Sequence, residues 1–462
     1  MLDQFAPIAV YSKLKEQFKE EVTFLFESAG NSEGNYSFII IGARERLIYK
    51  DNTTYYTDAA GDTQEHPISP FSFLKEYYSN TDTAYYQAQV KELGVGYVDG
   101  FIGFMGYDMV QVFEPVLEPF MASLDDTMNT PDMDLILPKM IVAYSHKDHK
   151  ITLISHIDSM RAQFDAIESM LKSSYSYTPL QPLEGDDEGS FAFSKEKFFE
   201  MVHQSKEMIR SGDVFQILMT NRFTRHVKVD PFSFYRILRT KNPSPYMFLM
   251  EYEDFSIVGS SPEVMVRLSE GELLLRPIAG TRRRGNTKQR DKELEEELLA
   301  DPKELAEHLM LIDLGRNDVG RVAKVGTVKV KDMMHIERYS HVMHIVSDVE
   351  ATLADDKDMF DLFAATFTAG TMTGAPKIRA MELIAEFEGL KRGFYSGAIG
   401  YFGFDGNMDS AITIRTSLVM PDRVILQAGA GIVADSVDEM EYLEVHNKLG
   451  ALMSSLDDLK AP

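Results

Sequence analysis

The chain reads Leu273-Leu274-Leu275-Arg276-Pro277-Ile278-Ala279-Gly280-Thr281, followed by Arg282, Arg283 and Arg284. An apolar run ends at the proline, and Gly, Thr and the densest positive charge of the chain come after it. A strand that ends in this way presents backbone N–H groups, a hydroxyl and guanidinium groups, which together can hold a small carboxylate. The alternative is the solvated basic end of a structural strand.

The same stretch forms one arm of a predicted hairpin. Its two apolar strands flank the loop Ser269-Glu270-Gly271, in which the glycine can adopt positive φ. If Leu268 pairs with Glu272, counting back along the strands places Glu263 opposite Pro277. A carboxyl group there can act as a general acid if its pKa is raised; otherwise it is a solvated residue after a turn.

Hairpins with tight turns follow one another from residue 254 onward, so consecutive strands are neighbours and the sheet is largely antiparallel. Helical periodicity interrupts them near residues 288–300, 302–314, 358–367, 376–387 and 436–454. This order predicts an α+β fold and not a doubly wound parallel sheet.

The main break in periodicity lies at residues 173–190, which gather Ser, Pro, Gly and acidic residues as linkers do. We therefore predict an N-terminal region at 1–172, a linker at 173–190 and a second region at 191–462. A helix begins soon after the linker at Ser194, a good N-cap residue.

The 462 residues carry a formal charge of −25 and include neither Cys nor Trp. This acidity argues against broad affinity for nucleic acid, and it means that an anionic ligand needs local positive charge or a bound cation. The lack of Cys excludes disulfides, thiolate metal sites and thiol nucleophiles, and it suits a cytoplasmic protein. No apolar run is long enough to span a bilayer, so we expect no membrane partner.

A second candidate site lies in a meander of three strands near residues 396–404, 408–420 and 424–433. Counting back from its two turns places Arg415 opposite Gly397 on one side and opposite Gly429 on the other. Tyr395, Arg415 and Gly429-Ala430-Gly431 then converge at one end of the meander. An arginine beside residues without side chains has room for a planar carboxylate, unless a structural acid already pairs with it.

Helix faces rich in glutamate form a third candidate. Glu441 and Glu444 fall on one face of the last helix, and Glu307 lies on an earlier one. Oxygen ligands without Cys suit Mg²⁺ better than zinc, although each Glu alone also fits a solvated helix face. Ser436 and Glu439 predict a capping box at the start of the last helix.

The run Thr368-Ala369-Gly370-Thr371-Met372-Thr373-Gly374-Ala375-Pro376-Lys377 leads into a helix, and the free N–H groups of that helix favour an anion. It is not a Walker loop, because the lysine follows Ala-Pro and not Gly. His344 lies in an apolar run, where a lone histidine is usually a satisfied core residue.

These features together resemble the chorismate-utilising enzymes, and among them most closely the large component of anthranilate synthase. The resemblance covers nearly the whole chain and is densest from about 190 to 455. Its motifs follow one another in the order of the family: PIAGTRRRG, HLMLIDLGRND, ERYSHVMHIVSDV, FTAGTMTGAPKIRAMELI, GFYSGAIGYF and QAGAGIVADS.

The resemblance implies two largely antiparallel sheets packed with helices around a deep site, a chorismate substrate and a Mg²⁺ cofactor. It also implies roles for matching positions. These are Glu263 as the acid that protonates the departing 4-hydroxyl, His344 and Thr371 as further active-site residues, Gly280, Thr281, Tyr395, Arg415, Gly429, Ala430 and Gly431 as chorismate contacts, and Glu307, Glu444 and Glu441 at the metal.

Two positions distinguish the reactions within this family. Aminodeoxychorismate synthases carry Lys where this chain has Ala279, and isochorismate and salicylate synthases carry Lys where it has Gln216. Ammonia needs neither lysine, so the resemblance implies amination of chorismate at C2, loss of the 4-hydroxyl and elimination of pyruvate to give anthranilate. A chain without Cys cannot hydrolyse glutamine by the thiol route, which implies a separate glutamine amidotransferase subunit.

Leu25-Phe26-Glu27-Ser28 resembles the tryptophan-sensing LLES motif of the family, with Phe in place of the second Leu, and residues 242–247 resemble the other side of that site. The resemblance thus implies feedback inhibition by tryptophan, with Ser28, Pro245, Tyr246 and Met247 as contacts. Two alternatives stay open: a component of aminodeoxychorismate synthase, and a non-catalytic sensor of chorismate or tryptophan.

Overall fold

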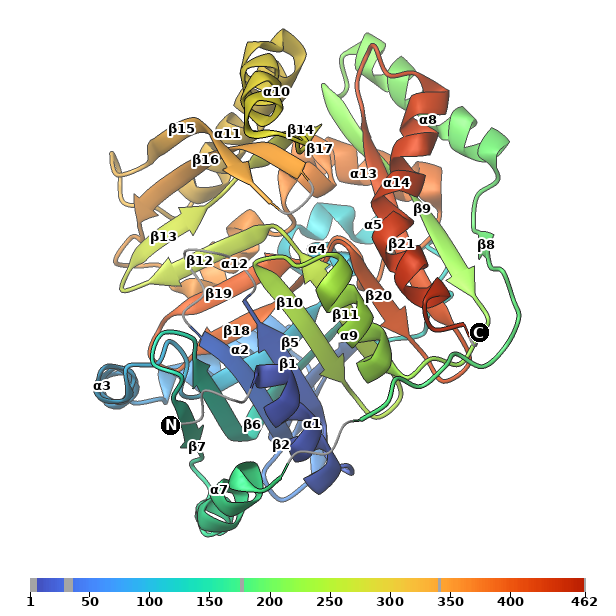
Figure 1. Cartoon of the computed structure of the whole chain (residues 1–462). Coiled ribbons are helices and arrows are strands. Elements are labelled where there is room, and N and C mark those ends of the chain that lie inside the picture. The colour runs from blue at the N-terminus through green and yellow to red at the C-terminus, as the bar shows by residue number, and fades with distance from the viewer. Residues whose placement is uncertain (1–5, 29–35, 175–177, 340–341, 461–462) are drawn as a thin grey trace.

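The computed structural model describes residues 6–28, 36–174, 178–339 and 342–460, in which helices surround a framework of strands (Figure 1). Every pairing between named strands is antiparallel, which confirms the predicted α+β class. Within these ranges, no helix combines the length and the apolar composition that crossing a membrane requires.

The strands alternate with helices along the whole chain. The strands are β1 (Thr23–Glu27), β2 (Tyr36–Lys50), β3 (Thr53–Thr57), β4 (Thr63–His66), β5 (Gly100–Met105), β6 (Met133–Ser145), β7 (Ile151–Ile154), β8 (Ser190–Phe191), β9 (Gln216–Arg225), β10 (Tyr246–Glu251), β11 (Ser256–Ser261), β12 (Val264–Ser269), β13 (Glu272–Leu275), β14 (Ile278–Arg283), β15 (Lys329–Arg338), β16 (Val342–Thr352), β17 (Gly374–Ala375), β18 (Ala398–Gly403), β19 (Met408–Ile412), β20 (Thr416–Val419) and β21 (Val424–Ile432). The helices are α1 (Pro7–Gln17), α2 (Pro70–Ser79), α3 (Thr83–Leu93), α4 (Val110–Phe113), α5 (Glu118–Met121), α6 (Asp158–Arg161), α7 (Phe164–Lys172), α8 (Lys195–Ser211), α9 (Pro231–Lys241), α10 (Lys288–Ala300), α11 (Pro302–Gly320), α12 (Met359–Thr366), α13 (Lys377–Glu388) and α14 (Asp438–Asp457), with 3₁₀ turns η1 (Tyr107–Met109), η2 (Pro115–Leu117) and η3 (Gly370–Met372).

The strands build two sheets that share the ribbon of β2 and β6. One sheet runs in the order β7, β6, β2, β1, β10, β11, β20, β21 and β9. The other runs in the order β3, β2, β6, β5, β18, β19, β12, β13 and β16. The two sheets that the resemblance implies are therefore present, and β2 and β6 join them into one hydrogen-bonded network.

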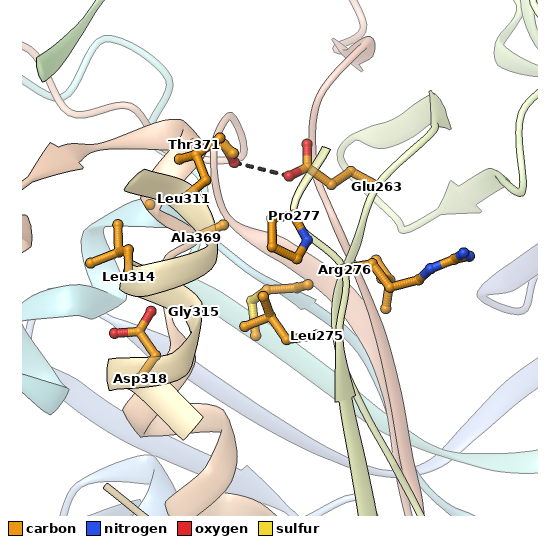
Figure 2. Close-up of a pocket in the computed structure, with 13 residues that line it drawn as sticks. Glu263, Leu275, Arg276, Pro277, Leu311, Leu314, Gly315, Asp318, Ala369 and Thr371 are labelled. Carbon is orange, nitrogen blue, oxygen red and sulfur yellow. Dashed lines mark hydrogen bonds between the residues drawn. The ribbon is translucent and has the colours of Figure 1, made fainter. Parts of the chain in front are cut away.

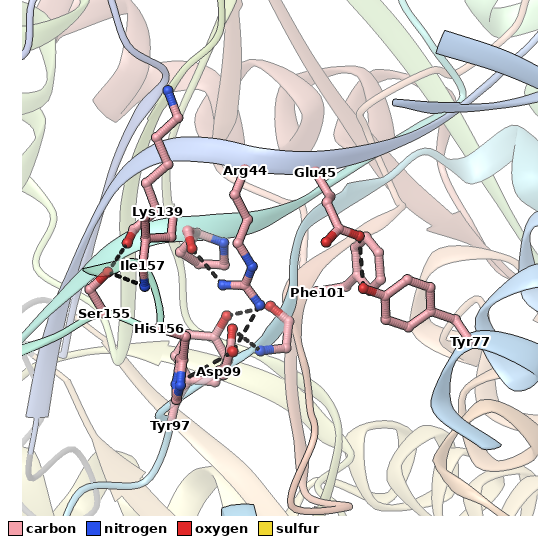
Figure 3. Close-up of polar contacts among 12 residues, drawn as sticks. Arg44, Glu45, Tyr77, Tyr97, Asp99, Phe101, Lys139, Ser155, His156 and Ile157 are labelled. Carbon is pink, nitrogen blue, oxygen red and sulfur yellow. Dashed lines mark hydrogen bonds and ion pairs between the residues drawn. The ribbon is translucent and has the colours of Figure 1, made fainter. Parts of the chain in front are cut away.

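The shared ribbon changes sheets at a bulge between Ala43 and Glu45, next to Gly42, which has φ 66°. A buried polar network lies beside this bulge (Figure 3). Arg44 Nη2 donates to Asp99 Oδ2 at 2.8 Å, and the Asp99 side chain is 1% exposed. A carboxylate buried this deeply needs such a partner, because an unpaired charge would lose its hydration without compensation.

In the C-terminal half of the chain, a second pair of adjacent segments passes from one sheet to the other. One segment carries β11 and β12, and the other carries β19 and β20. The strands β11 and β20 pair as far as Gly259 and Thr416, and pairing resumes in the other sheet where Val264 of β12 meets Ala411 of β19. The meander predicts one continuous strand at 408–420, and this prediction is wrong. The chain turns between β19 and β20 because each half pairs in a different sheet.

Backbone hydrogen bonds hold the two crossing segments side by side. The Ser260 N–H donates to the Arg415 carbonyl at 3.1 Å, and the Ile412 N–H donates to the Glu263 carbonyl at 3.0 Å. Arg415 has φ 49°, which non-glycine residues rarely adopt. The side chains of Glu263 and Arg415 therefore branch from the chain at the same break in the strand pairing.

The predicted register of the hairpin between β12 and β13 is wrong by one residue. Leu268 pairs with Leu273 and Ser269 pairs with Glu272. Only Glu270 and Gly271 form the turn, with φ 52° and 82°, because a two-residue hairpin loop favours positive φ at both positions. The shift leaves Glu263 at the same end of the hairpin.

The strand β13 ends at Leu275, just before Arg276 and Pro277, as the apolar run predicts. The strands β13 and β14 lie one after the other along the same edge of β16, interrupted by Arg276 and Pro277. Arg282 donates to Glu304 Oε1 and to Asp301 Oδ2, both at 2.9 Å, and so ties β14 to α11. Arg282 thus has partners within the protein, whereas the structural alternative predicts a solvated basic end.

The described part of the predicted linker lies along the second region. The Leu183 N–H donates to the Leu459 carbonyl at 2.8 Å, and residues 175–177 of the linker are outside the described residues. Pairing of β1 with β10 and of β5 with β18 connects the two sequence regions. The division at 1–172, 173–190 and 191–462 remains a proposal.

We predict that Gly103→Ala lowers the free energy of unfolding by about 2 kcal/mol, a typical cost of overpacking. A Cβ at Gly103 would lie 2.0 Å from the Asp134 carbonyl oxygen, across the pairing of β5 with the shared ribbon. Gly96→Ala is the control, since a Cβ there meets no heavy atom within 4 Å. Urea unfolding measures both, and equal midpoints for the two variants would contradict the prediction.

Candidate active site

Glu263 lies between β11 and β12 and is 7% exposed. The Thr371 hydroxyl, on η3, donates to Glu263 Oε1 at 3.0 Å (Figure 2). Burial raises the pKa of Glu263 to about 7, although this hydrogen bond and the charge of Arg415 favour the ionised form. The carboxyl group is therefore substantially protonated near neutral pH, as a general acid must be.

His344 lies on β16 and is 7% exposed. Its Nδ1 is 3.0 Å from the Thr281 hydroxyl and 3.0 Å from the Gly280 carbonyl, on β14. Burial lowers the pKa of His344 to about 4, so the ring is neutral. Because a carbonyl oxygen only accepts, a proton on Nδ1 satisfies Gly280 and leaves Nε2 as an acceptor.

The Arg415 guanidinium makes no hydrogen bond or ion pair with any residue of the described ranges. Burial lowers its pKa, and the nearby Glu263 and Tyr339 act in the opposite direction. A half-buried cation without a direct anionic partner is costly. A carboxylate ligand would supply the missing partner in planar, bidentate geometry.

The glycines of β21 lie opposite β9. Gly429, Ala430 and Gly431 pair with Thr220, Met219 and Leu218. A Cβ at Gly431 would lie 2.7 Å from Gln216 Nε2, so the Gln216 side chain covers this glycine. Gln216 Oε1 is buried and has no hydrogen-bond partner in the part of the chain that is described.

Tyr395 lies just before β18 and is 3% exposed. Burial raises its pKa, and a backbone hydrogen bond from Gly429 acts in the opposite direction. This contact brings Tyr395 to the glycine strand, as the meander predicts. The predicted pairing of Arg415 with Gly397 and Gly429 is wrong, because β18 pairs Ala398 with Ile412 and Arg415 lies in the break after β19.

The predicted metal ligands approach from α11 and α14. Burial raises the pKa of Glu307, and the charges of Glu304 and Glu444 raise it further. Burial also raises the pKa of Glu441, again with a contribution from Glu444. These carboxylates are thus close enough to repel one another, and a cation between them would relieve the repulsion.

No group of three His, Cys, Asp or Glu side chains in the described residues surrounds one point closely enough to hold a metal. Mg²⁺ is commonly bound by one or two carboxylates, with waters and substrate oxygens as its other ligands. The donor set of Glu307 and Glu444 fits this pattern. Lys448 Nζ now lies 2.8 Å from Glu444 Oε1 and donates to the Gly429 carbonyl at 2.8 Å.

The predicted capping box of the last helix is wrong. The helix α14 begins at Asp438 with Val437 as N-cap, one residue beyond Ser436. The Ser436 hydroxyl instead accepts the Val433 N–H at 3.0 Å, and Glu439 pairs with Lys195 at 2.7 Å.

Of two hollows in the described structure, only the smaller is lined by residues of the site. One, of about 30 Å³, lies below Glu263 and Thr371 between α11 and β13, as Figure 2 shows, and it is lined mainly by apolar side chains. It has room for a water molecule or two and not for a ring. A larger hollow, of about 610 Å³, contains none of the predicted site residues.

The predicted effector residues lie together at the ends of β1 and β10. Glu27 pairs with Met247, which places Ser28 beside the start of β10. The Tyr246 hydroxyl donates to Asp409 Oδ1 at 2.9 Å and accepts from Arg267 Nη2 at 3.1 Å.

The family model described as "chorismate binding enzyme" matches residues 6–454. The chain belongs to this family. Its curated relatives include the proteins named anthranilate synthase component 1 of Aquifex aeolicus (strain VF5), 41% identical over 471 residues, and of Acinetobacter calcoaceticus, 42% identical over 474 residues. Each alignment covers 99% of this chain, with 93% and 94% of the respective relative.

A crystal structure of anthranilate synthase component I from Streptococcus pneumoniae TIGR4 has the same fold. It superposes with a TM-score of 0.80 at 33% identity, covering 98% of both chains. The isochorismate synthase MenF from Escherichia coli, at 19% identity and a TM-score of 0.72, shares the fold alone. The chain is therefore an enzyme of the chorismate-binding family.

Two residues next to the site, Lys448 and Arg392, were not predicted from the sequence to belong to it. Lys448 reaches the Gly429 carbonyl from the next turn of the helix that carries Glu444. Arg392 donates to the Met372 carbonyl, next to Thr371, at 2.9 Å. The helical spacing of Glu444 and Lys448 could have indicated that Lys448 lies at the site. No local pattern indicates this for Arg392, because the carbonyl groups that it contacts are distant in sequence.

We predict that the stability of Glu263→Gln relative to the parent rises between pH 5 and pH 8, by on the order of 3 kcal/mol. The folded pKa of about 7 exceeds the ordinary value of 4.5, so the parent's stability is full below pH 4.5 and falls as pH rises through 7. Glutamine cannot ionise and avoids this loss. Urea unfolding measures the difference, with the exposed Glu386→Gln as control; a pH-independent difference would refute the pKa shift.

Proposed function

We propose that this enzyme is the chorismate-binding component of an anthranilate synthase. In this reaction, ammonia adds at C2 of chorismate, the 4-hydroxyl departs and pyruvate is eliminated to give anthranilate. The main support is the buried Glu263, which has a pKa of about 7 and lies at the same break as the unpaired guanidinium of Arg415. The relatives named anthranilate synthase component 1 agree with it.

Binding and proton transfer follow from these side chains. Chorismate carries two carboxylates, so an acidic chain must supply local positive charge, which Arg415 provides beside the glycine strand. Backbone N–H groups around Gly429, Ala430 and Gly431, with the Tyr395 hydroxyl, supply donors on that side. Glu263 gives its proton to the departing 4-hydroxyl, which then leaves as water and not as hydroxide.

The nitrogen source is inferred from two neutral side chains. Ala279 is buried on β14, and Gln216 is buried on β9 at the glycine strand. Neither provides an amine that could attack the ring or a base that could activate water. Free ammonia is already nucleophilic, and His344 Nε2 is an acceptor available near the reacting end.

We propose Mg²⁺ as cofactor, held by Glu307 and Glu444 with Glu441 nearby. When bound, the ion would neutralise a substrate carboxylate and strengthen its binding to an acidic protein. A separate glutamine amidotransferase subunit would supply ammonia in the cytoplasm, because the chain contains no Cys for thiol-dependent glutaminase chemistry.

The second candidate is a component of aminodeoxychorismate synthase, whose product carries the amino group at C4. Ala279 disfavours it, because the resemblance places a nucleophilic lysine at that position in those enzymes. A non-catalytic sensor is disfavoured by the retention of Glu263, Glu307 and Glu444.

We predict that the parent forms anthranilate from chorismate, Mg²⁺ and ammonium chloride, and that Glu263→Gln lowers kcat by about 10²–10⁴-fold, the usual contribution of a general acid. Chorismate binding persists, because glutamine has the same shape and Arg415 is unchanged. Anthranilate fluorescence measures turnover, and EDTA with and without added Mg²⁺ tests the cofactor. Parent-like turnover in Glu263→Gln would refute its role, and use of glutamine by this chain alone would refute the need for a partner.

We further propose that tryptophan inhibits the enzyme at Ser28, Pro245, Tyr246 and Met247. The prediction is that tryptophan binds the parent in isothermal titration and that Ser28→Leu weakens this binding at least tenfold, because a larger apolar side chain fills the site. Turnover without tryptophan stays within about twofold of the parent. If tryptophan titrated into the parent gives only the heat of dilution into buffer, the proposed effector site is contradicted.

A further inference from the structure

Arg392 connects three segments that build the candidate site. It is 1% exposed and lies in the link between α13 and β18, three residues before Tyr395. Its Nη1 donates to the Met372 carbonyl at 2.9 Å, and its Nη2 donates to the Leu218 carbonyl at 2.8 Å. Met372 directly follows Thr371, and Leu218 pairs with Gly431. One guanidinium therefore spans the turn that contacts Glu263 and the strand opposite the glycines.

Glu388 fixes the orientation of this guanidinium. Its Oε2 accepts from Arg392 Nε at 2.9 Å and its Oε1 accepts from Arg392 Nη2 at 2.7 Å, which makes the pair bidentate. The same Oε1 accepts the Thr220 N–H at 2.9 Å, and the Tyr107 ring centroid lies 4.8 Å from Arg392 Cζ. The planar fork cannot turn without losing several of these contacts.

This ion pair is buried too deeply to meet substrate, since its side chains are 1% and 2% exposed. A buried pair adds little net stability over apolar side chains of the same volume, because both charges lose their hydration. What an apolar pair cannot do is hold two carbonyl groups at a fixed separation. The geometry of Arg392, more than its charge, therefore needs explanation.

We propose that Arg392 is a positioning residue that, through Met372, holds the Thr371 hydroxyl against Glu263 and thereby orients the proton donor. The proposal rests on the proposed function, in which Glu263 protonates the leaving hydroxyl. Glu388 keeps Arg392 in place, and neither residue contacts chorismate. A change at Arg392 acts on turnover only through Thr371.

Three variants test this chain of contacts: Arg392→Lys, Thr371→Val and the double variant. Lysine keeps the charge but has one nitrogen, which cannot reach Glu388 and both carbonyls in the planar arrangement. We expect each single variant to lower kcat with ammonium by about 10–100-fold while KM for chorismate stays within about threefold. The double variant should lose no more than about threefold beyond the larger single effect, because both changes remove one interaction.

The pH profile gives a readout that a merely structural role would not move. The Thr371 hydrogen bond favours the ionised form of Glu263, so its loss raises the pKa of Glu263. Turnover that needs protonated Glu263 then persists to higher pH, and the alkaline limb of kcat shifts upward in Arg392→Lys as it does in Thr371→Val.

Arg44→Lys is the matched control, because Arg44 is also paired with a buried carboxylate, that of Asp99, at the other sheet crossing (Figure 3). It should lower the unfolding midpoint and leave kcat and its pH profile unchanged. If Arg392→Lys does not fold, Glu388→Gln is tested in its place. We expect it to change kcat and its pH profile in the same direction, by a smaller amount.

Multiplicative losses in the double variant, or an unmoved alkaline limb in a folded Arg392→Lys enzyme, would overturn the proposal. Turnover is followed as chorismate consumption and as anthranilate formation in the same samples. A parent that consumes chorismate without forming anthranilate would contradict the proposed function alone, since consumption would still show whether Arg392 acts through Thr371.

Discussion

Two neighbouring strands leave one sheet and enter the other side by side, and the candidate site depends on this crossing. Pairing between the two strands stops after Gly259 and Thr416 and resumes at Val264 and Ala411. Residues 262–263 and 413–415 have no ladder partner in either sheet. Glu263 and Arg415 lie within this gap. In a regular strand, the alternation of side chains between the two faces would have set the direction of each residue. The gap in the pairing instead lets the Glu263 carboxyl group and the Arg415 guanidinium lie together.

Burial then determines the chemistry of these groups. It raises the pKa of Glu263 towards neutrality and lowers that of His344 well below it, so both are neutral or nearly so at the same pH. Arg415 keeps its charge without a direct anionic partner among the described residues. The result is one proton donor, one neutral ring and one cation in a small volume, which are the groups needed to bind an anion and protonate its leaving group.

Much of the fold could be predicted from local signals. Helix α8 begins after Ser194 and ends before Gly212, as its cap residues indicate, and α10, α12 and α13 lie within a residue or two of their predicted ranges. The errors have two kinds of cause. The strand predicted at 408–420 divides because its halves pair with distant strands in different sheets. The capping error is local, because the Ser436 hydroxyl accepts the N–H of Val433, three residues before it.

Sequence patterns alone were enough to predict the antiparallel α+β class, the family and the candidate residue types, because periodicity, turn residues and ordered motifs are local properties. Which of those residues meet, and in what state of ionisation, depends on the tertiary structure. Glu263 and Thr371 are 108 residues apart, and their hydrogen bond exists because the sheet crossing and the turn fixed by Arg392 bring them together. Arg282 and Arg284, which follow Gly280, likewise have structural partners, since α10 and α11 supply carboxylates to them. Contacts of this kind depend on packing across the whole chain, which no short stretch encodes.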